Sequence, residues 1–183
     1  DEPDTVNSAG NPVHYLGLCW AGGHGRPASG FRTPRSVAAA SGALTACRRD
    51  VWDDLGGMAE LLFTYYEDTE LSLRTRLAGY DVRYVPSAVA LHRYEFGRHP
   101  AKLYLLERNR LATLLTVYER RTLVLLLPML VLQEGLVLAM AVREGWLPAK
   151  VRGWWWLARN AGALRRRRRL VQQHRRVSDA ALV

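Results

Sequence analysis

The chain has 183 residues, which is enough for one domain with a hydrophobic core or for part of a domain with an appendage. Its two cysteines, Cys19 and Cys47, lie in apolar runs without metal-ligand spacing, so buried reduced thiols are favoured over a disulfide. The formal net charge is +9. Residues 1–117 hold 13 basic and 13 acidic side chains, whereas residues 118–183 hold 13 basic and 4 acidic ones. The positive charge is therefore not spread over the whole chain. Its concentration in the last third predicts that this part binds an anionic surface.

The sequence begins at Asp1 without an initiating Met and shows no signal or transit peptide, so we expect it to start inside a longer protein. Two reduced thiols fit a cytoplasmic setting. A neutral globular part followed by a basic, hydrophobic tail is therefore the expected organisation.

The first part of the chain combines loops with short apolar segments. Residues 13–20 are predicted to form a strand. Residues 21–34 are rich in glycine but lack the spacing of phosphate-binding loops, so a surface loop is predicted there. A short helix is predicted over residues 48–57.

Residues 37–46 are small and apolar around Ser41, Gly42 and Ala43. Small side chains in an extended segment allow close approach by a ligand or by another backbone. The sequence alone leaves both alternatives open.

An aromatic run at residues 63–66 leads into three acids at the start of a predicted helix, Glu67, Asp68 and Glu70. The helix is indicated by apolar residues at three- and four-residue spacing up to Gly79, where a left-handed C-cap is expected. Helix dipoles favour acids in the first turn, so ordinary helix-start acids are one interpretation. The other is a general base, because a carboxylate beside an aromatic wall and a second carboxylate is suited to that role.

Asp68, Thr69 and Glu70 also have the acid-x-acid pattern of a metal motif. Positions two apart on a helix point about 200° away from each other. We therefore expect that Asp68 and Glu70 do not share one ion.

Three further elements follow this helix. Residues 81–86 are predicted to be extended, and residues 100–118 form the next predicted helix, with leucines available for one face. Residues 88–93 are predicted to form a second extended segment, which contains His92. Taken alone, His92 is typical of a surface or hydrogen-bonded histidine.

Residues 122–142 form an apolar segment of 21 residues, about 31 Å long as a helix, which is enough to span a bilayer. Glu134 would cost such a span about 3 kcal/mol, and Pro128 and the basic flanks also argue against a single crossing. We therefore expect helices that lie in the cytoplasmic interface of the membrane, broken near Pro128 and Gly135. One membrane-spanning helix stays an alternative.

The last part of the tail fits the same interface. Residues 154–156 are tryptophans, which suit the headgroup layer, and residues 165–169 are arginines, each of which contributes about 1 kcal/mol near an anionic lipid surface. The alternative is a packed two-helix appendage with solvated arginines.

Six motifs in a fixed order carry a family likeness. They are Ser41-Gly42-Ala43, Arg48-Arg49-Asp50-Val51-Trp52, Leu55-Gly56-Gly57-Met58, the run from Phe63 to Arg74, Ala78-Gly79-Tyr80-Asp81-Val82, and His92. Together they resemble the second half of a family 2 glycosyltransferase of the GT-A fold, and most closely the bacterial rhamnosyltransferase-like enzymes that build cell-surface polysaccharide.

The resemblance implies an α/β fold class: a partial GT-A sheet with flanking helices over residues 1–117, followed by an α-helical membrane-associated tail over residues 118–183. It implies an enzyme that transfers a sugar, with inversion, from a nucleotide-sugar donor to a hydroxyl of a glycan or lipid-linked acceptor. Such enzymes usually take a divalent metal, Mg or Mn.

The resemblance also implies roles for particular residues. Asp68 matches the general base that deprotonates the acceptor, and Glu67 would shape its electrostatic field. His92 matches a histidine that helps to hold the metal in some members of the family. The turn around Gly42, with its neighbours Ser41 and Ala43, would lie against the acceptor or donor sugar, with close strand packing as the alternative.

The family's donor-binding half and main metal motif precede these residues in a complete enzyme, and residues 1–62 do not supply them. We therefore expect an incomplete transferase that, as this chain alone, neither binds a nucleotide-sugar tightly nor turns over. Two other functions stay open: a non-catalytic basic membrane adaptor, and a nucleic-acid-binding module that uses residues 154–156 for stacking and residues 165–169, 175 and 176 for their charge. Nucleic acid is not favoured, because it leaves the Glu67 and Asp68 region unexplained.

Overall fold

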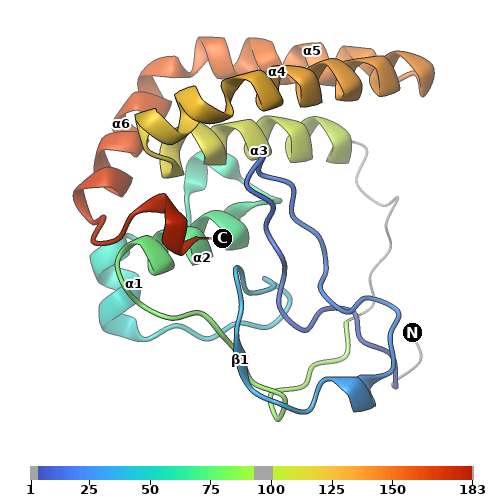
Figure 1. Cartoon of the computed structure of the whole chain (residues 1–183), viewed down its shortest axis with the longest axis vertical. Coiled ribbons are helices and arrows are strands. Elements are labelled where there is room, and N and C mark those ends of the chain that lie inside the picture. Colours follow the sequence, from blue (N-terminus) through green and yellow to red (C-terminus); the bar gives the residue numbers. More distant parts are fainter. Residues whose placement is uncertain (1–3, 93–100, 183) are drawn as a thin grey trace.

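The structure is a computed structural model that describes residues 4–92 and 101–182. Within these residues, most of the regular structure is helical (Figure 1). The elements in chain order are η1 (Ala28–Gly30), β1 (Arg35–Ser36), α1 (Arg49–Leu55), η2 (Glu60–Leu62), α2 (Glu67–Leu77), β2 (Arg83–Tyr84), α3 (Lys102–Val117), α4 (Arg120–Arg143), α5 (Leu147–Arg159), α6 (Ala161–Gln173) and η3 (Asp179–Ala181).

The sheet is smaller than expected. β1 and β2 pair antiparallel, with Arg35 opposite Tyr84 and Ser36 opposite Arg83. The other strand-like contacts in the described part of the chain are isolated bridges, such as the one that joins Asn11 to Ala39. The chain is therefore a mixed helical protein with a small two-stranded sheet.

The strand predicted over residues 13–20 is wrong, because the chain reverses direction there. His14 N donates to Leu18 O at 2.8 Å, and Gly17 N donates to His14 O at 2.7 Å. Gly17 has a φ of 83°, which a residue without Cβ adopts without strain. The segment is thus a tight turn, with Val13 bridged to Cys19.

Helices α1 and α2 confirm their predictions. The last turn of α2 is followed by Gly79 with a φ of 84°, which is the expected left-handed cap. The predicted helix over residues 100–118 is found as α3, while residue 100 itself lies outside the described residues. Leu73 and Leu77 of α2 pack with Leu114 and Val117 of α3 in one core cluster.

The chain after residue 117 packs onto α3 and returns to α2. Figure 1 shows α4 and α5 running side by side over α3, with α6 leading back toward α2. The backbone N–H groups of Arg176 and Val177 both donate to Leu77 O, at 2.7 and 3.2 Å. The division between residues 1–117 and 118–183 stays a prediction, and the two parts share extensive contacts through α3.

Helix α4 is continuous through Pro128 and Gly135, so the predicted break is wrong. Proline removes one backbone donor and costs about 3 kcal/mol inside a helix. A helix of 24 residues retains its other hydrogen bonds, and the reversal occurs instead near Gly145, which has a φ of 78°. Among the described residues, α4 is the one helix that is long and apolar enough to cross a membrane.

A buried ion cluster ties α4 to α3 and α5. Arg110 contacts Glu107 at 2.9 Å and also contacts Glu134. Lys150 contacts Glu134 at 2.9 Å and also contacts Glu107. Trp154 Nε1 donates to Glu134 at 2.8 Å. The acid in the middle of α4 therefore faces the protein rather than the outside.

The opposite face of α4 is apolar and exposed. Leu125 is 79% exposed and Leu136 is 64% exposed, whereas Ala141 on the inner face is buried. A continuous exposed apolar face of this kind marks an interaction surface. Around the whole of α4, the exposed large side chains are Val124, Leu125, Leu127, Met129, Val131, Leu132, Leu136, Met140 and Val142.

Candidate active site at the start of helix α2

An irregular turn places the acids of α2. Phe63, Tyr65 and Tyr66 have φ values of 66°, 65° and 69°, which side chains with Cβ rarely adopt. The Tyr66 hydroxyl donates to Gly17 O at 2.8 Å, and this contact ties the start of α2 to the 13–20 turn. The aromatic residues expected to form a wall are thus the residues that redirect the chain into the helix.

Asp68 points toward the turn at residues 41–43. Gly42 N donates to Asp68 Oδ2 at 2.8 Å, and Thr69 N donates to Asp68 Oδ1 at 2.6 Å. Thr69 Oγ1 also donates to Asp68 Oδ1, at 3.2 Å. A carboxylate oxygen accepts about two hydrogen bonds, so Oδ2 keeps one acceptor position for another donor.

Residue 42 packs closely against Asp68. A Cβ at residue 42 would lie 3.3 Å from Asp68 Oδ2 and 3.4 Å from its Cβ. The close neighbour of Gly42 within the protein is thus the Asp68 side chain, and the expected approach by a ligand stays a prediction. Ser72 extends the same contact: its hydroxyl accepts from Ala40 N at 3.0 Å and donates to Asp68 O at 2.7 Å.

Glu67 lies next to Asp68 but in a different environment. Its Oε2 atom is buried and has no hydrogen-bond partner among the described residues. Burial, with a further contribution from the charge of Asp68, raises the pKa of Glu67 above its usual range. Within the described part of the chain, neither Glu67 nor Asp68 forms an ion pair with Lys, Arg or His.

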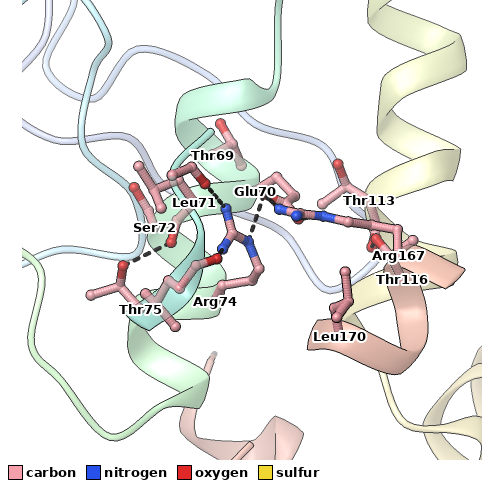
Figure 2. Close-up of polar contacts among 12 residues, drawn as sticks. Thr69, Glu70, Leu71, Ser72, Arg74, Thr75, Thr113, Thr116, Arg167 and Leu170 are labelled. Atoms are coloured by element: carbon pink, nitrogen blue, oxygen red, sulfur yellow. Dashed lines mark hydrogen bonds and ion pairs between the residues drawn. The ribbon is translucent and has the colours of Figure 1, made fainter. Parts of the chain in front are cut away.

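Glu70 points the other way, as the helical geometry predicts. It is 1% exposed and lies between two arginines (Figure 2). Arg74 Nε donates to Glu70 Oε2 at 2.8 Å, and Arg167 Nη2 donates to Glu70 Oε1 at 2.9 Å. Arg74 also donates to the carbonyls of Leu55 and Gly57, at 2.6 Å each. Glu70 is thus a structural acid that joins α2 to α6.

Cys19 closes the inner side of this site, where its Sγ atom lies 3.4 Å from Thr69 Oγ1. Burial raises the pKa of the Cys19 thiol to about 11, so the thiol stays protonated and unreactive at neutral pH. Cys47 is exposed, and the prediction that it is buried is therefore wrong. Both cysteines are free.

A cavity of about 950 Å³ opens beside the 41–43 turn. Ser41 and Ala43 line it on one side, and His92 lies on its wall as well. His92 Nδ1 is 2.9 Å from Asn7 Nδ2. The structure thus brings Ser41, Ala43 and His92 to one cavity, whereas Gly42 turns its N–H toward Asp68.

The described residues do not supply a metal site by themselves. They contain no group of three or more His, Cys, Asp or Glu side chains that could hold an ion. The assignment of His92 as a metal ligand stays a prediction.

The sequence analysis missed Arg108 and Asn109 of α3, which contact the 62–66 turn. Both are buried, and Asn109 Nδ2 donates to Tyr65 O at 2.7 Å. The available signal was a polar run, residues 107–110, inside an otherwise apolar helix.

Comparison with known proteins gives one family and two relatives. The family model described as "Glycosyltransferase like family 2" matches residues 24–115, about half of the chain. Over 69 residues the chain is 41% identical to "N-acetylglucosaminyl-diphospho-decaprenol L-rhamnosyltransferase" of Mycobacterium tuberculosis, strains CDC 1551 / Oshkosh and ATCC 25618 / H37Rv. The match covers 37% of this chain and 22% of each relative, so it spans about a fifth of their length. No solved structure matches the chain.

Proposed function

The chain belongs to the glycosyltransferase-like family 2, and on this premise we propose that it is the acceptor-side part of an inverting transferase. The donor would be a nucleotide-sugar, and the acceptor a hydroxyl of a lipid-linked glycan, as the name of the mycobacterial relatives suggests. We assign residues 1–117 to the second half of a GT-A domain, and a role in cell-surface polysaccharide synthesis accompanies this proposal. Rhamnose as the transferred sugar rests on the likeness to these relatives.

The observation that carries the proposal is the Asp68 carboxylate, which lacks an ion-pair partner among the described residues and faces the 41–43 turn. Its Oδ2 atom would accept the proton of the acceptor hydroxyl as that oxygen attacks the anomeric carbon. The bond from this carbon to the diphosphate then breaks, and its electron pair leaves with the nucleotide. Gly42 N–H and Thr69 hold the base in place without neutralising its charge.

Glu67 would act on this base through its charge. Burial raises the pKa of Glu67, and the carboxyl group lies next to Asp68, so its charge contributes to the electrostatic field at the base. The cavity beside Ser41, Ala43 and His92 is the space proposed for the sugar. Asp68 does not line this cavity, and it contacts the 41–43 turn at Gly42 N. The divalent metal of the family would be held mainly by residues outside those described, and no step is assigned to it.

We also propose that the exposed face of α4 lies on an anionic membrane at the cytoplasmic side. Leu125 and Leu132 point outward, while Glu134 is held by Arg110 and Lys150, so the helix can lie flat without burying that acid in lipid. Trp155 is exposed at 60% and suits the headgroup layer. A lipid-linked acceptor would be reached from such a position.

The two rival functions receive less support. A nucleic-acid-binding module needs free tryptophans and arginines, but Trp154 donates to Glu134, and Arg108 covers the Trp156 ring at 4.3 Å. Arg167 contacts the buried Glu70. A non-catalytic membrane adaptor would not explain why the Asp68 carboxylate faces the 41–43 turn without an ion-pair partner among the described residues.

The experiment uses the complete gene product that contains this chain, and it compares wild type with Asp68→Asn over a panel of nucleotide-sugars. We expect transfer to fall by about 10²- to 10⁴-fold in Asp68→Asn, because a general base is lost, while donor binding survives. The matched control is Asp54→Asn, an exposed acid of α1 that does not line this cavity. Equal activity in wild type and Asp68→Asn would refute the base, and no transfer in either would favour the adaptor.

The membrane proposal has a separate test, which is cosedimentation with vesicles that contain anionic lipid. Leu125→Glu with Leu132→Glu is expected to abolish binding, because two charges enter the apolar face. Val89→Glu with Leu91→Glu adds the same charge at exposed positions away from α4 and should leave binding intact. Equal loss in both pairs would point to charge alone and contradict the proposal.

A further inference from the structure

The turn that precedes the candidate base is held in a strained conformation. Phe63 has φ 66° and ψ −72°, and Thr64 N donates to Leu62 O at 2.9 Å. These values define a γ-turn with positive φ, which is rare and strained in proteins. Tyr65 and Tyr66 follow with positive φ as well. Strain of this kind persists only when surrounding contacts enforce it, and such residues cluster at functional sites.

The enforcing contact is Asn109 of α3, which is 0% exposed. Its single amide nitrogen donates to Leu62 O at 2.9 Å, to Thr64 O at 2.9 Å and to Tyr65 O at 2.7 Å. Three carbonyls of the turn therefore converge on one donor group. Without it, the carbonyls of Thr64 and Tyr65 would lose this donor, whereas Leu62 O would still accept from Thr64 N and from Arg108.

Arg108 fixes the orientation of this amide. Arg108 Nε donates to Asn109 Oδ1 at 2.8 Å, so the amide nitrogen must point toward the turn. Arg108 Nη2 also donates to Leu62 O, at 2.7 Å, and the guanidinium packs on the Trp156 ring. Arg108, which orients the Asn109 amide, is thus itself in contact with a side chain of α5.

The 62–66 turn leads directly into the first residues of α2. Tyr66 is the residue directly before the helix, and Asp68 is its second residue. The Asp68 carboxylate contacts Gly42 N at 2.8 Å, and a shift of about 1 Å would break this hydrogen bond. The distal part of α2 is held separately, by Glu70 and by the core around Leu77.

We propose that Asn109, oriented by Arg108, is a positioning residue: it holds the 62–66 turn in its strained form and thereby sets the Asp68 carboxylate against Gly42 N–H. The assignment of Asp68 as the base rests on the proposed function, whereas the geometric link between Asn109 and the Asp68–Gly42 contact does not. A misplacement of about 1 Å that originates away from the reacting atoms can cost about 100-fold in rate.

The test measures the amide resonance of Gly42 by NMR in the chain itself. Asn109→Asp keeps the volume but replaces the donors with acceptors that repel the three carbonyls. We expect the Gly42 amide proton to move toward its position in Asp68→Ala, in which the acceptor is absent. Asn109→Ser, which retains one donor and adds no charge, should move it by a smaller amount.

The matched control is Val117→Ala, at a buried position on the same helix. It destabilises the chain through the core, and it should leave the Gly42 resonance in place. Phe63→Gly is the rescue variant, because Phe63 is 76% exposed and glycine adopts its φ without strain. Combined with Asn109→Ser, it should return part of the Gly42 shift.

In the complete gene product, the same Asn109 variants should lower kcat by about 10- to 100-fold and leave KM for the donor unchanged. An unchanged Gly42 resonance in folded Asn109→Asp, or an equal movement in Val117→Ala, would overturn the positioning role even if transfer is confirmed. A moved resonance in a protein without any transfer activity would overturn the proposed function and leave the geometric link standing.

Discussion

Two acids that are two residues apart in one helical turn have opposite surroundings. Glu70 is enclosed by Arg74 and Arg167, and each of its oxygens is paired with a cation. Within residues 4–92 and 101–182, the Asp68 carboxylate accepts only from neutral groups, the N–H of Gly42 and the N–H and hydroxyl of Thr69. The sequence signal for both is the same, a first-turn acid. The presence or absence of a cation distinguishes a structural acid from one that is free to accept a proton.

Two acids near the tail helices are paired with cations, as Glu70 is. Glu107 and Glu134 are enclosed by Arg110 and Lys150, and the cluster joins three helices. Burial alone therefore does not indicate function in this molecule. Asp68 and Glu67 differ from these paired acids, because they are partly buried and have no ion-pair partner among the described residues.

The largest expected effect on stability is that of Glu70→Ala. It leaves Arg74, which is 3% exposed, and Arg167 without their counter-charge, and an uncompensated buried charge costs about 3–5 kcal/mol. Urea unfolding followed by circular dichroism measures the change. Glu60→Ala, at an exposed acid, is the control and should stay within about 0.5 kcal/mol of wild type. Similar losses in both variants would remove the distinction between the acids.

Arg167→Ala removes the partner of Glu70 that lies on α6. The hydrogen bonds to the charged Glu70 are lost, and we expect a decrease of about 1.5–3 kcal/mol in the free energy of unfolding. Arg166→Ala is the matched control, because Arg166 is the exposed neighbour in the same arginine run. If the two variants unfold at the same urea concentration, Arg167 does not connect α6 to α2.

Asp68→Asn should have a small effect on stability, in contrast to its effect on transfer. Asn has one acceptor oxygen where Asp has two, so it keeps the hydrogen bond from Gly42 N–H or the one from Thr69 N–H, but not both. The interaction of the charge with the helix dipole is lost as well, and together these changes cost about 1–2 kcal/mol. The melting temperature of the purified chain measures this change. A loss as large as that of Glu70→Ala would identify Asp68 as a structural acid and weaken its assignment as a base.

The smallest expected effect is a pH dependence from Glu67. Because its pKa is raised in the folded protein, the folded state holds the proton more tightly than the unfolded state does. Stability from this group is therefore full below the unfolded pKa of about 4.3 and decreases as the pH rises through the raised value. Glu67→Gln removes the charged form, so its melting temperature should exceed that of wild type at pH 7 and not at pH 4. Parallel curves would contradict the raised pKa.

The helices were largely predictable from sequence, because local signals determine them. Apolar spacing and Gly79 gave the limits of α2, and leucine spacing gave α3. The direction of the Asp68 and Glu70 side chains followed from helical geometry alone. The strand prediction over residues 13–20 was wrong, because Gly17 adopts a positive φ and the chain turns there despite the surrounding apolar residues.

The partners of these side chains could not be predicted, since they come from distant parts of the chain. Arg167 lies 97 positions after Glu70, and Asn109 lies 44 positions after Tyr65. The arginine run suggested lipid contact, and the sequence does not indicate that Arg167 turns inward. Likewise, Glu134 suggested a poor membrane span, but its ion pairs with Arg110 and Lys150 depend on how α4 packs.

Four consecutive residues of α3 serve two neighbours at once. Glu107 and Arg110 contact the tail helices, while Arg108 and Asn109 contact the 62–66 turn. An extra residue between Arg108 and Asn109 would rotate the second half of the helix by about 100° relative to the first and would break both sets of contacts. The length of α3 is thus fixed by geometry, and a single-residue insertion or deletion here would be far less tolerated than a substitution.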